Sequence, residues 1–324
     1  MAEPLLRIEG LKTHFATDDG MVHAVDGVDL EVDRGETLGV VGESGSGKTV
    51  TALTVVKLIA MPPGRIVAGR ILWQGRDLAP LSSEELRPIR AREIAVIFQE
   101  PMTSLNPVFT IGEQIAEVLR LHENLSRKAA LARTVEMLDL VKIPNPQRRA
   151  GDYPHQFSGG MRQRVMIAMA LACNPKLLIA DEPTTALDVT IQAQILELLA
   201  ELKGRLGMAV MLITHAMGVI AENAQRVAVM YAGKVVEEAP VAELFRAPRH
   251  PYTQGLIRSI PRVDVGAGER RRLAAIPGVV PALINPPEGC RFAPRCAHAK
   301  AQCTAATPAL RAVGERHRAA CVLA

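Results

Sequence analysis

The chain has 324 residues, which is enough for two compact units with a substantial buried core. Apolar residues make up 48% and charged residues 22%, both ordinary for a globular protein. A net charge of only +4 and an aromatic content of 3% argue against a nucleic-acid-binding surface. No apolar run reaches the roughly 18–20 residues of a membrane span, and the N-terminus lacks the pattern of a signal peptide. We therefore expect a cytosolic protein that reaches a membrane only through a partner.

The first hundred residues predict strands interrupted by one glycine-rich loop. Residues 5–33 alternate apolar and polar positions, which is typical of short β segments. The apolar strand Thr37–Val41 follows, and a helix is expected from about Lys48. Residues 64–100 again favour strands and end in the segment EIAVIFQ. A strand, a glycine-rich loop and a helix in this order are typical of a nucleotide-binding α/β fold.

The pattern changes to helical periodicity over residues 102–157, which we interpret as an inserted helical segment. A second α/β pattern follows it, and the last 75 or so residues are rich in Pro, Ala, Arg and Cys. The elements expected after the insert are a helix over 160–173, the buried strand Leu177–Ala180, a helix over 189–205, the strand Val210–Thr214 and strands near 227–238. The sequence thus predicts a nucleotide-binding α/β core with a helical insert.

Residues 42–49 match the P-loop pattern between a buried strand and a helix. Glycine lets backbone N–H groups turn toward phosphates, and the helix N-terminus adds a favourable dipole. Lys48 is expected to reach the β- and γ-phosphates of ATP, and the Thr49 hydroxyl to ligate Mg²⁺. A ligand-free turn is the alternative, but a match of this length with these flanks argues against it. The loop residues predicted to hold ATP are Gly42, Ser44, Gly45 and Gly47.

Two acids follow the second buried strand. Residues 177–180 are apolar and end in Asp181 and Glu182, at the end of a strand that reaches a site in α/β folds. Asp181 is predicted to hold Mg²⁺, and Glu182 to polarise the attacking water as general base. Acids also end strands simply because a loop begins there. The continuation Pro183–Asp188 argues for the functional interpretation.

The segment Phe157-Ser158-Gly159-Gly160-Met161 completes a pattern that resembles the ABC ATPase family across roughly residues 5–240. The resemblance implies a P-loop NTPase with a RecA-like core, an antiparallel β subdomain and an inserted helical subdomain. It also implies that Ser158, Gly159 and Gly160 grip the γ-phosphate of ATP held by the opposite subunit. A helix N-terminus preceded by serine suits this role as an anion site.

Other positions fall in the order of the family. Gln99 resembles the lid-loop glutamine that senses Mg²⁺, Asp188 the acid of the loop crossing the dimer interface, and His215 the switch histidine at the γ-phosphate. Phe15 is placed like the aromatic that stacks on adenine, but a lone Phe at a strand end is equally well explained as a core residue. Ala216 stands where the family leads us to expect Asp.

Phe157 and Met161 also depart from the commoner Leu and Gln of the signature, although the phosphate-gripping serine and glycines remain. No catalytic position is degenerate, and we predict an active ATPase that hydrolyses ATP as a dimer. Rival hypotheses are a non-catalytic nucleotide-binding module, an exporter subunit and a soluble ABC ATPase without a transport role. The absence of fused spans, a second cassette and basic arms disfavours the last two.

Residues 249–256 and the Pro- and Cys-rich end resemble the C-terminal extension of oligopeptide/dipeptide importer ATPases, as does the segment Gln99–Pro107. The resemblance implies an ATPase domain over 1–245 and an extension over 246–324. It implies a peripheral protein at the cytoplasmic face of the cell (inner) membrane. The implied partners are two integral-membrane permease subunits, a second ATPase subunit that is a paralogue, and an external solute-binding protein, without nucleic acid. Relatives in this group import nickel or other small solutes, which is the alternative cargo.

Four cysteines gather at the end of the chain, where clustering in a reducing compartment suggests a metal site before disulfides. Their irregular spacing fits structural zinc poorly, and a 4Fe–4S cluster is the favoured expectation, with zinc or free thiols as alternatives. His298 and His317 are expected to be solvated, and Cys173 to be a buried apolar residue. The predicted cluster ligands are Cys290, Cys296, Cys303 and Cys321.

Overall fold

The structure is a computed structural model that describes residues 3–99, 104–185, 187–260 and 275–324. Contacts divide the chain into two compact units. Residues 100–103, which include the start of the predicted helical insert and part of the importer-like segment, lie outside the described residues. The first unit comprises Met1–Glu31, Thr37–Ala79 and Thr214–Ala324, and the second comprises Val32–Glu36 and Pro80–Ile213.

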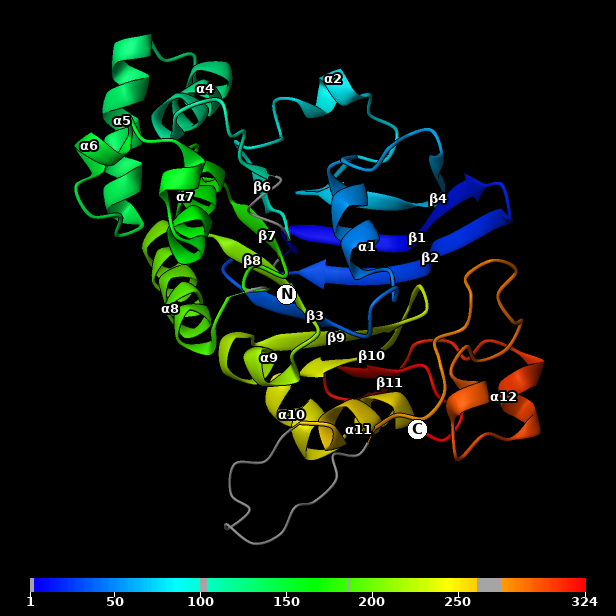
Figure 1. Ribbon diagram of the computed structural model, residues 1–324. Helices are drawn as coiled ribbons and strands as arrows, with labels where there is room; N and C mark the ends of the chain where they lie inside the picture. The colour runs from blue at the N-terminus through cyan, green and yellow to red at the C-terminus, as the bar shows by residue number, and fades with distance from the viewer. Residues whose placement is uncertain (1–2, 100–103, 186, 261–274) are drawn as a thin grey trace, which may run out of the picture. The chain divides into compact units, whose positions relative to one another are not determined.

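The first unit contains a four-stranded antiparallel sheet with the strand order β2-β1-β4-β5 (Figure 1). The sequence predicted short β segments before residue 33, and the chain forms two long strands instead. β1 and β4 pair from Leu6 opposite Trp73 to Phe15 opposite Gly64, with register shifts around Lys12 that let the long ribbon twist. The strands are β1 (Leu6–Thr17), β2 (Gly20–Val32), β4 (Gly64–Trp73) and β5 (Arg76–Asp77).

The other strands of the first unit lie in the order β11-β12-β10-β9-β3. β3 and β9 run parallel and are buried at every position, which explains why both sequences are apolar after their first residues, Thr37 and Arg226. The strands are β3 (Thr37–Val41), β9 (Arg226–Tyr231), β10 (Lys234–Pro240), β11 (Arg311–Gly314) and β12 (His317–Ala319). The helices of this unit are α1 (Lys48–Val55), α9 (Met217–Asn223), α10 (Val241–Arg246), α11 (Pro251–Arg258) and α12 (Ala301–Ala305), with the short 3₁₀ turn η2 (Ala293–Arg295).

The second unit combines the parallel strands β6, β7 and β8 with a helical layer in which α4, α5 and α7 pack together (Figure 1). Side-chain caps explain where its helices begin: Thr110 and Glu113 form a capping box at α4, and Ser126 caps α5. The helices are α2 (Ser83–Leu86), α4 (Ile111–Glu123), α5 (Arg127–Leu140), α6 (Pro146–Arg149), α7 (Gly159–Leu171) and α8 (Val189–Leu206), with η1 (Pro154–Gln156). The strands are β6 (Ile94–Ile97), β7 (Leu177–Asp181) and β8 (Ala209–Thr214). Within the described segments, no helix is long and apolar enough to span a bilayer.

The C-terminal extension belongs to the first unit, and its residues provide hydrogen-bond partners for a buried acid of β10. Glu237 is fully buried; it accepts backbone N–H bonds from Arg249 and His250 at 2.6 and 2.9 Å, and its Oε1 lies 2.8 Å from Nε2 of His317. His317 is therefore buried rather than solvated as expected, whereas His298 is exposed. The division by contacts does not separate residues 246–324 from the rest of the first unit. The expected domain boundary near residue 245 stays a prediction.

Because His250 is buried, we expect the folded protein to lose stability at acidic pH. Its side chain is buried, its Nδ1 accepts the N–H of Tyr252 at 3.1 Å, and burial lowers its pKa to about 4. The unfolded chain takes up this proton below its ordinary pKa of about 6.5 while the folded chain does not. Above pH 6.5 the ring is neutral in both the folded and the unfolded chain, so its burial carries no protonation cost. As the pH drops toward 4, the free energy of unfolding falls by up to about 3 kcal/mol.

His250→Asn keeps a capping acceptor but removes the titration, so its denaturation midpoint is expected to fall less between pH 7 and 4.5 than that of the parent protein. Chemical denaturation at both pH values measures the difference. Parallel pH profiles for the two proteins would contradict the assignment.

Candidate active site

The P-loop of the first unit has a backbone that only glycine adopts without cost. Gly45 and Gly47 have φ values of 76° and 95°, in the left-handed region. Gly47 is the N-cap of α1, and a Cβ there would lie 2.4 Å from the carbonyl oxygen of Ala24. A Cβ on Gly42 would lie 2.2 Å from the carbonyl oxygen of Met230. The glycines thus allow the loop to lie directly against β2 and β9.

Lys48 lies within the curve of this loop. Its Nζ donates to the carbonyl oxygens of Gly42 at 2.7 Å and Glu43 at 3.0 Å, and to Oγ of Ser46 at 3.4 Å, and its side chain is buried. A buried ammonium held by neutral oxygens, together with the N-terminus of α1, fits a chain of phosphates. The exposed Thr49 in the first turn offers a hydroxyl oxygen of the kind that Mg²⁺ takes.

Two other predicted residues belong to the same unit. Phe15 is half-buried on β1, opposite Gly64 on β4. Its ring packs so closely on Gly64 that a Cβ there would lie 2.9 Å from a ring carbon. The adenine-stacking role of Phe15 stays a prediction. His215 is exposed after β8, and Ala216 caps α9 without a side-chain hydrogen bond. Asp, Ser or Asn at such a position stabilises a helix by about 1 kcal/mol.

The second unit brings Gln99 and Glu182 together. Nε2 of Gln99 donates to Oε2 of Glu182 at 3.1 Å, and Oγ1 of Thr185 donates to the same oxygen at 2.9 Å. Asp181, the residue before Glu182, is the last residue of β7 and is buried. Glu182 itself has a φ of 46°, and its N–H donates to Ile213 at 2.9 Å.

A non-glycine residue in the left-handed region costs of order 1 kcal/mol and is concentrated at functional sites. This backbone turn at Glu182 is not visible in the sequence, which shows only a strand that ends in two acids. It places the carboxylate on the Gln99 side chain, although 83 residues separate the two.

The serine and glycines of the signature-like segment begin α7. Ser158 is exposed and its Oγ accepts the N–H of Met161 at 3.4 Å. Gly159 is exposed too, whereas a Cβ on Gly160 would lie 2.7 Å from Cγ2 of Ile191 on α8. Asp188 caps α8 by accepting the N–H of Ile191 at 3.0 Å. Ser158, Gly159 and Asp188 thus lie at exposed helix starts, where binding groups are commonly found.

Comparisons with known proteins decide the family. The sequence model described as ABC transporter matches residues 25–185, and the one described as oligopeptide/dipeptide transporter, C-terminal region, matches residues 236–303. The oligopeptide transport ATP-binding protein OppD of Bacillus subtilis is 56% identical over 91% of this chain and 82% of its own. The dipeptide transport ATP-binding protein DppD of Escherichia coli is 49% identical over 98% of this chain and 96% of its own. The chain belongs to the ABC transporter family of ATP-binding proteins.

Solved structures agree with this assignment to the ABC ATPases. The dimeric post-hydrolysis state of the ATP-binding cassette MJ0796, bound to ADP and phosphate, aligns with a TM-score of 0.65 at 28% identity, covering 73% of this chain and 98% of that one. The cassette cbiO1 of Clostridium perfringens aligns with a TM-score of 0.64 at 25% identity, covering 76% and 92%. The predicted P-loop fold and ATPase activity are thereby confirmed, and the ABC ATPase fold binds ATP and Mg²⁺.

The predicted 4Fe–4S cluster is wrong for this ABC ATPase. The four C-terminal cysteines line one cavity with His250 and Phe292, but its volume is about 10 Å³, room for at most one water molecule. Their thiols do not form a metal-binding group among the described residues, and the descriptions of OppD and DppD name only ATP binding and transport. Burial also raises the pKa of Cys290 and Cys296, which disfavours the thiolate form that binds metals. Cys173 is buried, as predicted, and burial raises its pKa to about 11.

The described residues contain one close group of potential metal ligands, His14, His23 and Asp26. The two imidazole rings stack with centroids 4.0 Å apart. Burial by itself raises the pKa of Asp26, but the neighbouring Lys234 and Arg291 lower it below its usual value. The carboxylate is therefore already engaged by cations, which oppose a further positive charge.

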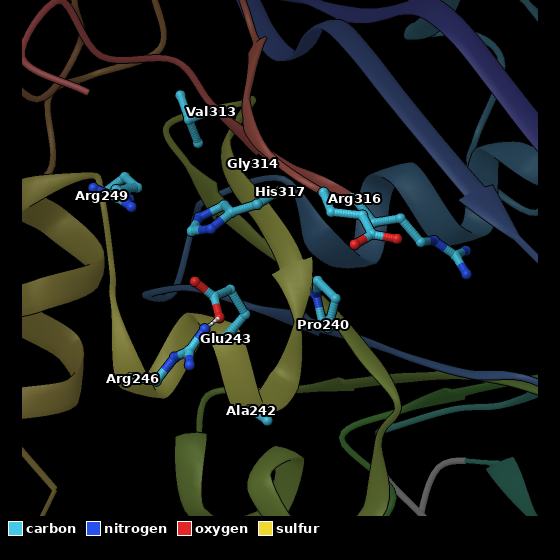
Figure 2. A pocket seen from close by; sticks show the side chains of 10 residues that line it. Pro240, Ala242, Glu243, Arg246, Arg249, Val313, Gly314, Arg316 and His317 are labelled. Carbon is cyan, nitrogen blue, oxygen red and sulfur yellow. Dashed lines mark hydrogen bonds and ion pairs between the residues drawn. The ribbon is translucent and has the colours of Figure 1, made fainter.

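A separate cavity of about 610 Å³ lies where α10 meets the turn between β11 and β12 (Figure 2). Glu243 and Arg246 form an ion pair at its wall, and His317 is bonded to the buried Glu237. None of the predicted ATP-site residues is among the described residues that line it. The cavity is therefore distinct from the predicted ATP site.

Gly47 and Gly45 offer a matched test of the P-loop backbone. Gly47→Ala is expected to lower the melting temperature of the nucleotide-free protein by several degrees more than Gly45→Ala, because only the first substitution puts a methyl group against backbone. Both residues carry the left-handed penalty of about 1 kcal/mol, and no described atom lies within 4 Å of a Cβ at Gly45. Equal melting temperatures for the two variants would show that the close contact with Ala24 does not constrain the loop.

Proposed function

We propose that this ABC ATPase powers the uptake of dipeptides or oligopeptides across the cell membrane. The match of residues 236–303 to the oligopeptide/dipeptide transporter C-terminal region carries the proposal, because this extension lies outside the ATP-binding cassette common to the family. The relatives OppD and DppD, which cover nearly the whole chain, support the same cargo class. Import of nickel or another small solute is the alternative from the sequence, and no relative named above supports it.

The partners follow from this assignment. The ATPase associates peripherally with two integral-membrane permease subunits at the cytoplasmic face, and an external solute-binding protein delivers the peptide. A second ATPase subunit, a paralogue of this chain, completes the dimer. The N-terminus of α7, with the exposed Ser158 and Gly159 and the half-buried Gly160, suits a role toward ATP on the opposite subunit.

The site residues divide the work of hydrolysis in this proposal. Lys48 and the loop Gly42–Thr49 would hold the phosphates. Thr49, Asp181 and Gln99 would each offer an oxygen to Mg²⁺, which when bound would neutralise phosphate charge. Glu182 accepts a proton from the attacking water as general base, and its two hydrogen bonds fix the carboxylate for this step. His215 is the switch histidine at the γ-phosphate, and Asp188 belongs to the loop that crosses the dimer interface. Phe15 stacks on adenine.

Glu182→Gln tests the general base. The variant is expected to keep ATP binding and lose about 10²–10⁴-fold in turnover, because the amide cannot accept the proton. ATP binding and phosphate release are measured on the assembled complex. The matched control is Glu197→Gln, an exposed acid on α8 that is expected to leave turnover unchanged. Near-normal turnover of Glu182→Gln would remove the residue from this role.

The cargo is tested on the whole transport complex, purified through this subunit from its native membrane and reconstituted in lipid. Dipeptides, oligopeptides, nickel chelates and sugars are presented with their external binding proteins while ATP hydrolysis is followed. We expect stimulation by peptides alone. Stimulation by another solute would replace the cargo, and a preparation without any membrane subunit would contradict the transport role itself.

A further inference from the structure

Arg295 of the C-terminal extension binds the P-loop directly. Its Nη1 lies 2.6 Å from Oε2 of Glu43, and its Nη2 lies 3.0 Å from Oε1, so the guanidinium and the carboxylate meet in a two-point ion pair. Glu43 is the second residue of the P-loop, 252 positions earlier in the chain. The Arg295 side chain is 4% exposed, and that of Glu43 is 30% exposed. A two-point pair of this kind, with the guanidinium buried and the carboxylate partly exposed, is the strong form of a charged hydrogen bond.

The guanidinium is fixed by its other contacts as well. Nε donates to the carbonyl oxygen of Pro277 at 2.9 Å, Nη2 to that of Ile276 at 3.2 Å, and Nη1 to the hydroxyl of Tyr231 at 3.3 Å. The group also lies 5.7 Å from the ring centroid of Tyr231 and 6.0 Å from that of Phe292. Each nitrogen of the side chain therefore has a partner, and the fork cannot turn away from Glu43 without losing several bonds.

A second contact holds the backbone at the same residue. The N–H of Glu43 donates to the hydroxyl of Tyr252, the second residue of α11, at 2.9 Å. Tyr252 is fully buried against Tyr231 and Phe292, with ring centroids 4.7 and 5.4 Å away. The side chain and the main chain of Glu43 are thus both bound by residues that follow the ATP-binding cassette in sequence.

Fixing Glu43 also fixes the oxygen atoms that hold Lys48. The carbonyl oxygens of Gly42 and Glu43 accept from Nζ of Lys48 at 2.7 and 3.0 Å. The flanking loop is rich in glycine, and ordering each such residue costs about 1–2 kcal/mol. A loop that is held before ATP arrives avoids part of that cost at the moment of binding.

We propose that Arg295 is a positioning residue for ATP: through its ion pair with Glu43, the C-terminal extension holds the P-loop in its nucleotide-binding conformation. The extension then contributes to the nucleotide site in addition to distinguishing this type of transporter ATPase from others. The effect of Arg295 on ATP affinity does not depend on which solute is transported. A negative result for Arg295 would leave the peptide-import proposal intact, and a different cargo would leave the role of Arg295 intact.

The test is a double-mutant cycle on the full-length protein with Arg295→Gln, Glu43→Gln and the double variant. ATP dissociation constants are measured on the purified chain, and KM and kcat on the assembled complex. We expect each single variant to bind ATP about tenfold more weakly, a size ordinary for coupled charged pairs. KM should rise in parallel while kcat at saturating ATP changes less than twofold. The double variant should bind no more weakly than either single one.

Arg318→Gln is the matched control. Arg318 also belongs to the extension and pairs with a buried acid of the cassette part, Glu238, but not with the P-loop. We expect its ATP affinity to stay within twofold of the parent even if its melting temperature falls. Arg295→Lys, which keeps the charge but not the fork, should fall between the parent and Arg295→Gln and guards against a variant that does not fold.

Three results would overturn the proposal. The first is unchanged ATP affinity in Arg295→Gln with only a lowered melting temperature, which would make the pair a structural tether. The second is equal loss of affinity in Arg318→Gln, which would assign the effect to general loosening of the extension. The third is a double variant in which the two losses simply add, because independent residues do not act through one contact.

Discussion

Contacts between carboxylates and basic side chains from the last 35 residues join the C-terminal extension to the rest of the first unit. Glu237 meets His317, Glu238 meets Arg318 as well as Arg226, Asp26 meets Arg291, and Glu43 meets Arg295. An isolated charge inside a protein costs several kcal/mol, and removing one partner of a buried pair leaves that cost uncompensated. The cassette part and the extension therefore need one another, and strand pairing of β12 with β10 extends the same contact.

The same constraint reaches the chemistry through the P-loop. Glycines bring the loop against β2 and β9, Lys48 holds two of its carbonyl oxygens, and Arg295 holds Glu43 from the other side. The aromatic residues Tyr231 and Tyr252 exclude water around the guanidinium, which strengthens its attraction for the carboxylate. A nucleotide thus meets a loop whose shape is already largely set by neighbours distant in sequence.

The second unit orders the carboxylate of Glu182, the proposed general base, differently. Glu182 lies at the end of a fully buried strand, and a left-handed backbone turn directs it toward Gln99 and Thr185. The strain of that turn is offset by the packing of the strands around it. In the first unit, charge pairs provide the order; in the second, a buried strand end and hydrogen bonds from the uncharged side chains of Gln99 and Thr185 provide it.

The sequence by itself determined the motifs, the order of the elements and the family, because the P-loop, the two acids at the end of β7 and the signature are short local patterns tied to one chemistry. It also indicated four cysteines close together, but not that the space between them is too small for a cluster. Only the tertiary structure decided that His317 is buried, that Glu182 turns toward Gln99 and that Arg295 binds Glu43. Those contacts join residues about 80 to 250 positions apart, and the sequence pattern of a single charged residue does not specify its partner, which depends on how strands and loops pack in three dimensions.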